Sequence, residues 1–332
     1  MTSTQSIGIS LIIVLILAAF ASGLSAVGLT GLMTNILPYI VIAIFFIGFI
    51  RRILLWAKSP VPFCIPTTSG QQKSLPWIKA NPVDNPSNIG GVIARMFLEI
   101  FFFRSLFRNI RMDTTEERPI YGSAKWLWFF GLMFHWSLLF IVVRHLRFFL
   151  EPVPWLINGL SAVDGFFEIG IPALYLTDAA VLGALSFLIL RRIVIPQWRY
   201  ISLVQDYFAL FLILGIVITG LWMRHIVPVD LLQIKALVLR WTALSPVIPR
   251  GIGLVFYIHF FFVCVLVAWF PASKLMHMPG IFLSPTRNLI NDSRRTRHLN
   301  PWDCPVKVHT YAEYEDEFRD KMKAAGLPVE KE

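Results

Sequence analysis

Six apolar stretches, each roughly long enough to cross a bilayer, constrain the fold of this chain more than any other feature. A helix needs about 20 mostly apolar residues to span the hydrocarbon core. The chain is 56% hydrophobic and only 15% charged, whereas soluble domains average about 25% charged residues. We therefore expect an all-α integral membrane protein with six transmembrane helices, the first of them uncleaved. The stretches cover approximately residues 7–29, 37–56, 124–150, 171–190, 203–223 and 252–270.

The formal charge of +10 lies among these stretches, because residues 285–332 carry nine Lys/Arg and nine Asp/Glu. Residues 51–125 carry eleven Lys/Arg against five Asp/Glu. The positive-inside rule then places this insert and both termini in the cytoplasm, in a multi-pass protein of the inner membrane. The basic residues around the last outer loop run against this assignment, which rests on the larger count. No basic block is interleaved with aromatic residues, so nucleic acid is not an expected partner.

Residues 58–123 and the C-terminal tail are predicted to lie outside the membrane. Residues 90–112 mix five charges with bulky apolar residues, which favours an interfacial helix within a cytoplasmic loop. In the tail, Thr310 and Glu313 have the spacing of a helix capping box, and Gly326 is a reasonable helix end. The tail helix is expected to pack either on its own membrane domain or on a partner subunit.

Three cysteines without a Cys-x-x-Cys pair argue against an iron–sulfur cluster held by this chain alone. Such clusters usually take four thiolates. An electron carrier of another kind would have to use different ligands.

Four histidines stand inside or beside predicted spans. His135 and His145 are ten residues apart on span three, so about 80° and about 15 Å separate them on one helix. His259 and His277 are eighteen residues apart, which is five turns and a rise of about 27 Å if the last helix continues. Each pair can therefore face the interior of a helical bundle.

Spans three and six run in opposite directions, so His145 should face His259 and His135 should face His277. Two facing pairs at two depths are what two bis-histidine haems b require. The unequal rises require tilted helices or a kink at Pro271. A single intramembrane histidine is often only a packing residue, and four of them could also form a proton relay. His225, at an outer membrane edge, lacks a matching partner.

This histidine spacing resembles the gamma subunit of respiratory nitrate reductase (NarI), a five-helix dihaem cytochrome b that oxidises quinol. The resemblance covers about residues 37–278. It implies His145 and His259 as ligands of the distal haem, and His135 and His277 as ligands of the haem nearer the cytoplasm. The first span, the long basic insert and the tail depart from that pattern.

The tail, "NPWDCPVKVHTYAEYEDEFRDKMKAAGLP", and the total length resemble the DsrM family, the membrane cytochromes of the DsrMKJOP complex of dissimilatory sulfur metabolism. That resemblance implies menaquinone as substrate and further membrane and periplasmic subunits. It also implies a cytoplasmic iron–sulfur partner, DsrK, which is similar to the catalytic subunit of heterodisulfide reductase. The chain would then divide into segments 1–57 (two helices), 58–123 (cytoplasmic loop), 124–284 (four-helix haem domain) and 285–332 (tail).

Three charged residues are candidates beside the haem ligands. Asp178, in "PALYLTDAAVLG", is an ionisable residue in a span and is predicted to take protons from quinol; the alternative is an ion pair with Arg144 or Arg147. Arg144 and Arg147 flank His145 and match the carboxylate geometry of haem propionates. Equally, they could be interface anchors with extended side chains.

The sequence thus favours a membrane electron conduit of an oxidoreductase complex, in which menaquinol is oxidised near the outer haem and electrons leave toward an iron–sulfur subunit. Two alternatives remain open. One is a cytochrome b anchor of a heterodisulfide or nitrate reductase; the other is a proton-coupled transporter with a histidine relay.

Overall fold

The computed structural model describes residues 3–59, 81–115, 118–165, 174–245, 251–291 and 308–331. The described chain is mostly helical. Five of the six predicted spans are confirmed as helices long and apolar enough to cross a membrane. They are α1 (Ser3–Ala26), α2 with α3 (Thr30–Asn35 and Leu37–Ala57), α6 with the 3₁₀ turn η1 (Lys125–His145 and Leu146–Phe148), α10 (Val204–His225), and α12 with η2 (Leu254–Trp269 and Phe270–Ala272).

The remaining predicted stretch, the fourth along the chain (residues 171–190), corresponds in its described part to α8 (Leu176–Val194). This helix has 19 residues and carries Asp178, Arg191 and Arg192, whereas each of the other five spans contains an apolar stretch of 18 residues with at most two charged residues. It packs against α6 and α10 inside the bundle. Its length fits a crossing, while its charges lie at its two ends.

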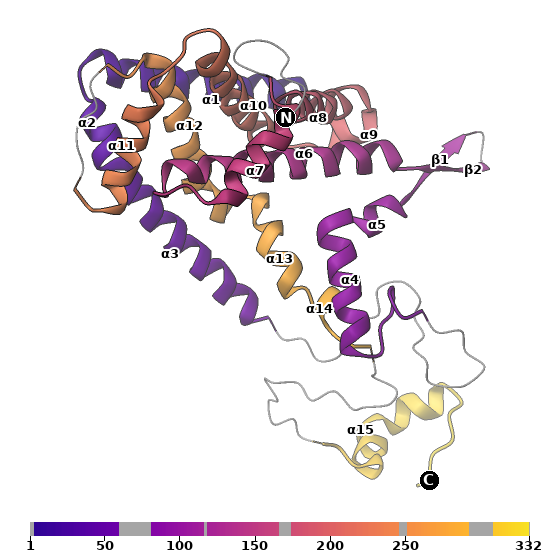
Figure 1. The fold of residues 1–332 in the computed structure, drawn as a ribbon. Helices are drawn as coiled ribbons and strands as arrows, with labels where there is room; N and C mark the ends of the chain where they lie inside the picture. The colour runs from indigo at the N-terminus through magenta and orange to yellow at the C-terminus, as the bar shows by residue number, and fades with distance from the viewer. Residues whose placement is uncertain are drawn as a thin grey trace.

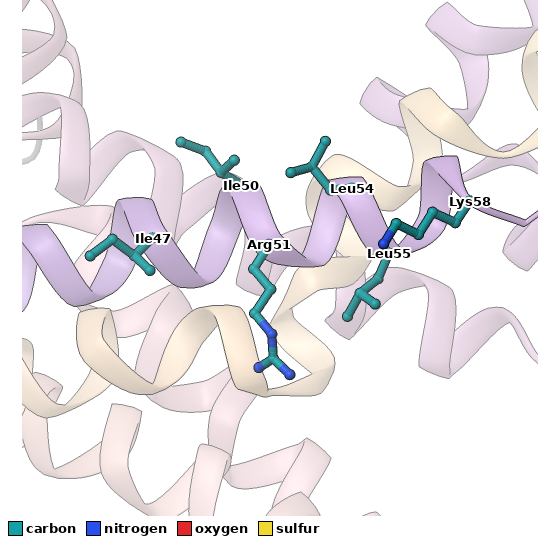
Figure 2. A pocket seen from close by; sticks show the side chains of 6 residues that line it. All are labelled: Ile47, Ile50, Arg51, Leu54, Leu55 and Lys58. Carbon is teal, nitrogen blue, oxygen red and sulfur yellow. The ribbon is translucent and has the colours of Figure 1, made fainter.

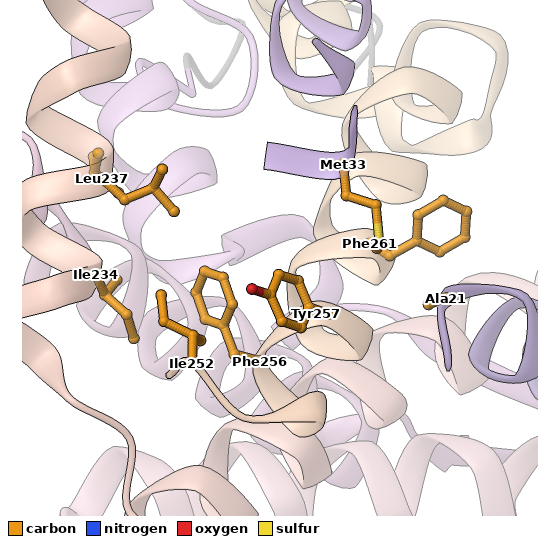
Figure 3. Close-up of a cluster of buried hydrophobic side chains, with 9 residues drawn as sticks. Ala21, Met33, Ile234, Leu237, Ile252, Phe256, Tyr257 and Phe261 are labelled. Atoms are coloured by element: carbon orange, nitrogen blue, oxygen red, sulfur yellow. The ribbon is translucent and has the colours of Figure 1, made fainter. Parts of the chain in front are cut away.

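The membrane helices form a bundle in which α1 packs on α10 and α12, and α3 packs on α12 (Figure 1). We call the end that holds His145 and His259 the distal end, and the end that holds His135 and His277 the proximal end. A buried apolar cluster fills the distal end between α1, α2, α12 and the short helix α11 (Leu231–Thr242) (Figure 3). Its members include Ala21, Met33, Ile234, Phe256 and Tyr257.

The last span does not continue as one helix to His277, contrary to one of the two geometries considered from the sequence. After Trp269 the chain makes two 3₁₀ turns, η2 (Phe270–Ala272) and η3 (Lys274–Met276), before α13 (His277–Leu283) and α14 (Pro285–Asn288). Pro271 lacks the N–H that an α-helix needs, so the break falls where the sequence indicated a kink. A Cβ on Gly48 of α3 would lie 2.8 Å from the Cβ of Pro271, which shows how closely α3 approaches the break.

The insert before α6 is more structured than a loop with one interfacial helix. It contains α4 (Ile89–Phe102), α5 (Arg104–Phe107) and a hairpin of β1 (Ile110–Thr115) and β2 (Arg118–Ser123), in which Ile110 pairs with Ser123. The helix predicted over residues 90–112 therefore ends ten residues early, at Phe102. Residues 60–80, the Pro-rich part of the insert, lie outside the described residues.

The remaining helices are α7 (Trp155–Asp164), α9 (Pro196–Ile201) and α15 (Tyr311–Ala324). The predicted capping box of α15 is confirmed, because Thr310 Oγ1 accepts from the N–H of Glu313 and Glu313 Oε2 accepts from that of Thr310. Gly326 ends the helix with a φ of 71°. Figure 1 shows α15 on the far side of α4 and α14 from the bundle. Of the cysteines, Cys264 is buried and free, and Cys64 and Cys304 lie outside the described residues.

Candidate functional site

His135 and His277 face each other at the proximal end. Their ring centroids are 6.0 Å apart and their ring planes are inclined by 80°. An imidazole nitrogen binds a metal ion at about 2 Å, so two imidazoles sharing one ion would have ring centroids roughly 6 Å apart. The geometry of this pair fits the pairing expected from the sequence.

His145 and His259 lie together at the distal end. His145 is the last residue of α6, and His259 lies in the second turn of α12. The two rings are close enough to interact electrostatically. The structure therefore places the members of each expected pair at the same end of the bundle, with His135 and His277 in ring contact.

All four rings are engaged at Nδ1. His135 Nδ1 lies 2.7 Å from Gly131 O, His145 Nδ1 lies 2.7 Å from Ile141 O, and His277 Nδ1 lies 2.9 Å from Lys274 O. His259 Nδ1 lies 3.0 Å from both Ile216 O and Thr219 Oγ1. A carbonyl oxygen only accepts, so Nδ1 carries the proton and Nε2 keeps a lone pair for a metal ion.

The rings also remain accessible, although their helices are apolar. His135, His145 and His277 are exposed, and His259 is partly exposed. Across the described ranges, no group of three or more His, Cys, Asp or Glu side chains forms a metal-binding cluster. A bis-histidine haem needs only two imidazoles, so the donor set fits haem b better than a metal ion held by protein ligands alone.

A salt bridge holds the segment that carries His277. Lys274 Nζ lies 2.7 Å from Asp206 Oδ1, and Asp206 Oδ2 also accepts from the N–H of Leu203 at 3.0 Å. Asp206 therefore caps the start of α10 and also anchors the break after α12. The carbonyl of Lys274 then orients the His277 ring.

A buried cluster of charges lies beside His145. Arg144 pairs with Asp164, and its other terminal nitrogen lies 3.6 Å from Asp178 Oδ1. Asp164 additionally accepts from the N–H of Thr177 at 2.8 Å and from its hydroxyl at 2.6 Å. The structure thus shows the ion pair between Asp178 and Arg144 that was the alternative to a proton-accepting role.

Tyr175 lies between two guanidinium groups in this cluster. The Arg144 Cζ atom is 3.7 Å, and the Arg224 Cζ atom 4.0 Å, from the centroid of its ring. Stacked guanidinium groups are attracted to the ring face. This arrangement fixes Arg144 on its face as well as at its two terminal nitrogens.

Arg147 is less fully engaged than Arg144. One of its terminal nitrogens donates to Ser161 Oγ. Its Nε is buried and has no hydrogen-bond partner among the described residues. A buried N–H without a partner is costly, so Arg147 keeps a donor for an acceptor group beside His145.

The comparison with protein families shows to which family the chain belongs. The model of the nitrate reductase gamma subunit family matches residues 107–293. The chain belongs to the nitrate reductase gamma subunit family. The matched segment contains all four paired histidines, and the chain is a multi-pass membrane protein.

Two curated relatives are similar to most of this gamma-subunit chain. Both carry the name "Hdr-like menaquinol oxidoreductase cytochrome b-like subunit". The protein from Archaeoglobus fulgidus is 46% identical over 277 residues, which are 81% of this chain and 82% of the relative. The protein from Archaeoglobus profundus is 43% identical over 274 residues, 80% of this chain and 81% of the relative.

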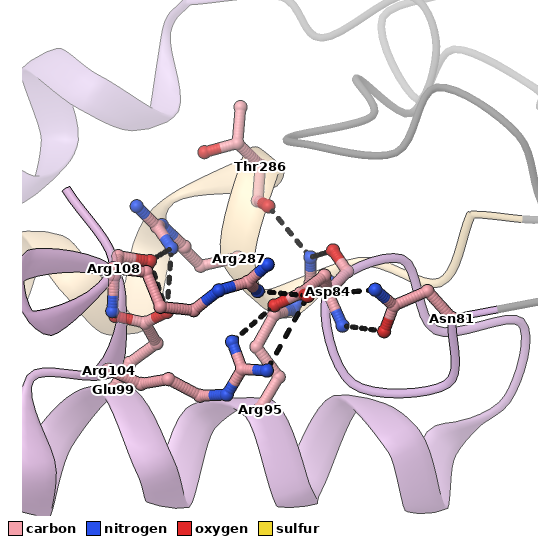
Figure 4. Close-up of polar contacts among 9 residues, drawn as sticks. Asn81, Asp84, Arg95, Glu99, Arg104, Arg108, Thr286 and Arg287 are labelled. Atoms are coloured by element: carbon pink, nitrogen blue, oxygen red, sulfur yellow. Dashed lines mark hydrogen bonds and ion pairs between the residues drawn. The ribbon is translucent and has the colours of Figure 1, made fainter. Parts of the chain in front are cut away.

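Most of the insert, including α4 and all of α5 except its last residue, precedes the part matched by the gamma subunit family. A polar network anchors it at the proximal end (Figure 4). Asp84 pairs with Arg104 at 2.5 Å and with Arg108, and accepts from Asn81 Nδ2 at 2.8 Å. The buried Arg95 donates to the carbonyl of Asp84 at 3.2 Å. The charged face of α4 is thus turned inward.

The same network reaches the segment that follows His277. Arg95 donates to the carbonyls of Thr286 and Leu289, at 3.3 and 3.2 Å. Arg287 pairs with the buried Glu99 at 3.0 Å. The insert and the end of the gamma-subunit domain are therefore one connected structure.

A surface pocket of about 510 Å³ has none of the paired histidines in its lining (Figure 2). Its lining residues all belong to α3 or its end: Ile47, Ile50, Arg51, Leu54, Leu55 and Lys58. A single helix with apolar residues and two long cationic side chains is typical of a lipid-facing surface.

Three residues in or beside the histidine pairs were not predicted from the sequence. Thr219 of α10 is hydrogen-bonded to His259, and Phe103 packs on His135. Asp164 forms an ion pair with Arg144, next to His145. Thr219 gave no signal because a threonine in an apolar helix is ordinary. Asp164 gave no signal because an acidic residue between two predicted spans is ordinary.

Proposed function

We propose that this chain is the dihaem cytochrome b subunit that carries electrons between menaquinol and a cytoplasmic iron–sulfur subunit. The observation that carries the proposal is the pairing of His135 with His277, whose rings are spaced for one shared metal ion. The second pair, His145 with His259, has the same Nδ1 engagement. Family membership and the names of the relatives support the same conclusion.

Each pair would hold one haem b through its Nε2 atoms. Bound haem supplies a one-electron carrier, and the protein supplies its ligands, orientation and surroundings. The carbonyls of Gly131, Ile141 and Lys274, with Ile216 and Thr219 for the fourth ring, hold the imidazoles in the ligating tautomer. A proton relay would instead need the rings to exchange protons at both nitrogens, and Nδ1 is committed to main-chain oxygen in all four.

Arg147 is the better candidate for a haem propionate. Its Nε is buried without a partner among the described residues, and a guanidinium matches a carboxylate well. Arg144 is already held by Asp164, Asp178 and Tyr175. We therefore assign propionate binding to Arg147, and to Arg144 a structural role in the cluster of charges beside His145.

Asp178 is the candidate proton acceptor for menaquinol. It lies in the first turn of α8 and shares Arg144 with Asp164. Its contact with Arg144 is the longer of the two, at 3.6 Å, so the Asp178 carboxylate is held less tightly than that of Asp164. Menaquinol would lose its protons there while its electrons pass to the distal pair.

The membrane arrangement follows from the same proposal. We assign α8 as a sixth crossing, the proximal end to the cytoplasmic face of the inner membrane, and both termini to the cytoplasm. Within the segment 58–123, α4 would lie in the interface, since Ile89, Ile93 and Phe97 are exposed on one face while Arg95 and Glu99 are buried on the other. We keep the expected division of the rest of the chain into two N-terminal helices (1–57), a four-helix haem domain (124–284) and a cytoplasmic tail (285–332).

The partner is proposed to be an iron–sulfur protein of the heterodisulfide reductase type. The relatives are named Hdr-like, and the DsrK partner implied by the tail resemblance belongs to the same class. A DsrM-like role in sulfur metabolism, with further membrane and periplasmic subunits, rests on that tail resemblance. In the tail, Tyr311 and Tyr314 are exposed on α15 and are candidates for this contact.

Reduction of the purified protein by a menaquinol analogue tests the proposal. A reduced haem b band should appear with the quinol alone, and oxidised iron–sulfur partner should then bleach it. A protein that shows the dithionite-reduced band but no band with quinol would not be quinol-reactive. A pull-down of the full chain against Tyr311→Ala and Tyr314→Ala variants tests the tail contact.

A further inference from the structure

Phe103 has a backbone conformation that a bulky residue rarely adopts. It stands between α4 and α5 with φ 51° and ψ 45°. This left-handed region is uncommon outside Gly, Asn and Asp because the Cβ approaches the following carbonyl. Strained residues of this kind persist where the surroundings over-determine them, and they concentrate at functional sites.

Two indole groups from α6 hold the chain at this turn. Trp128 Nε1 donates to the carbonyl of Phe102 at 2.7 Å, and Trp136 Nε1 donates to that of Phe101 at 3.1 Å. Both donors come from the helix that carries His135, one on each side of it in sequence. The carbonyls at the end of α4 are thereby satisfied by side chains beside a haem ligand.

The other side of the turn is tied to the segment after His277. Glu99 accepts from the N–H of Ser105 at 3.2 Å, and Arg287 donates to Ser105 Oγ at 2.6 Å and to Glu99 at 3.0 Å. The turn is therefore fixed against α6 and α14 at once. These contacts leave the Phe103 side chain little freedom.

The consequence is a ring contact with His135. The centroids of the Phe103 and His135 rings are 4.9 Å apart and their planes are inclined by 84°. This is the edge-to-face arrangement that aromatic rings prefer. Phe134 contacts the same imidazole at 5.1 Å and also at 84°, so two phenyl rings and the Gly131 carbonyl define its orientation.

We propose that Phe103 is a positioning residue that fixes the rotation of the His135 imidazole and thereby tunes the proximal haem. The inference rests on the proposed function, because it concerns the haem held between His135 and His277. Groups that orient a metal ligand set the electronic character of the metal. Phe103 precedes the family-matched residues 107–293, so this control comes from the insert of this chain.

Redox titration and electron paramagnetic resonance of the purified, membrane-extracted full chain test the proposal. The variants are Phe103→Leu, which keeps apolar bulk, Phe103→Gly, which also relieves the left-handed strain, and Phe103→Tyr, which keeps the ring. Phe102→Leu is the matched control, since its side chain is exposed and only its carbonyl meets Trp128.

Phe103→Leu and Phe103→Gly should shift the midpoint potential and the low-spin signal of one haem, the one that His135→Ala removes. The other haem should keep the wild-type values, and Phe103→Tyr and Phe102→Leu should keep both. Wild-type values for both haems in Phe103→Leu and Phe103→Gly would overturn this inference alone. A wild-type protein without haem b would overturn the proposed function and this inference with it.

Discussion

The hydroxyl of Thr219 on α10 lies 3.0 Å from Nδ1 of His259 on α12. The hydroxyl donates to the carbonyl of Gly215 at 2.7 Å, so it is placed to accept from the imidazole N–H. A neighbouring helix thus contributes directly to the tautomer and orientation of His259. The contact joins α10 to the proposed distal haem site.

Replacing Thr219 by Val should weaken the distal haem site. The substitution keeps the β-branched shape and removes the hydroxyl, and loss of such a supporting contact lowers metal-site affinity by about 10-fold or more. Haem titration of the apoprotein measures the effect. Thr219→Ser keeps the hydroxyl and should bind as the wild type does; equal affinity of the Val variant would show that the contact is incidental.

Loss of Asp206 should lower the unfolding free energy more than loss of Lys274, although the two residues form one ion pair. The Lys274 side chain is 65% exposed, so Lys274→Met should cost at most about 1 kcal/mol of unfolding free energy. Asp206→Ala also removes the bond to the N–H of Leu203 at the start of α10, a cap worth about 0.5–2 kcal/mol. The two variants are compared by thermal unfolding in detergent, with release of the proximal haem as the signal that is monitored.

Lys58→Met is the control for charge at the same end, because Lys58 is exposed at the C-terminus of α3. It should leave the unfolding midpoint unchanged. If Lys274→Met destabilised as much as Asp206→Ala, the cap at α10 would contribute nothing.

Asp178→Asn should slow haem reduction by a menaquinol analogue by roughly 100-fold, the usual contribution of a positioned proton acceptor. Reduction by dithionite should be unaffected, because it does not require proton removal from quinol. Glu151→Gln is the matched control, since Glu151 is a largely exposed carboxylate paired with Lys235. If Asp178→Asn left the rate of haem reduction by the quinol unchanged, Asp178 would have only a structural role, as the ion-pair partner of Arg144.

The anchoring of the insert should weaken at low pH through Asp84. Burial alone would raise its pKa, but hydrogen bonds from Arg108 and Asn81 and the charges of Arg104 and Arg108 outweigh burial and hold the pKa below the ordinary value of 3.8. A carboxyl whose folded pKa is depressed stabilises the fold above its unfolded pKa. That contribution is lost as pH falls below 3.8 through the folded pKa.

Asp84→Asn should therefore lower the unfolding free energy by about 1–3 kcal/mol at pH 6. The difference from the wild type should shrink as pH falls below 4, because the wild-type carboxyl then becomes neutral as well. Unfolding midpoints of both proteins between pH 6 and pH 3 provide the comparison. A difference that stays constant over this range would mean that the Asp84 charge is not what anchors the insert.

The sequence was sufficient to predict five membrane spans, because each is a long apolar stretch. It also predicted the approach of His135 to His277, because spans three and six run in opposite directions. The ten-residue spacing fixes the angle between His135 and His145 on α6. The eighteen-residue spacing does not do the same for His259 and His277, because the last helix breaks between them. The mismatch between rises of about 15 and 27 Å required either tilted helices or a kink, and the structure breaks the last helix at Pro271.

Contacts between distant segments were beyond reach from the sequence. The burial of Arg95 and Glu99 depends on the carbonyls and cations of residues 284–291, which periodicity does not place. The end of α4 at Phe102 depends on indoles supplied by α6, and no Gly or Pro marks it. Asp164 becomes a partner of Arg144 only because α7 folds back on α6.

Haem b content per chain, measured in the wild type and in four His→Ala variants, tests the paired histidines most directly. The wild type should hold two haems b. His135→Ala and His277→Ala should each lose one and leave the same remaining spectrum, and His145→Ala and His259→Ala should each lose the other. A wild type without haem b, or loss of different haems from His135→Ala and His277→Ala, would contradict the pairing.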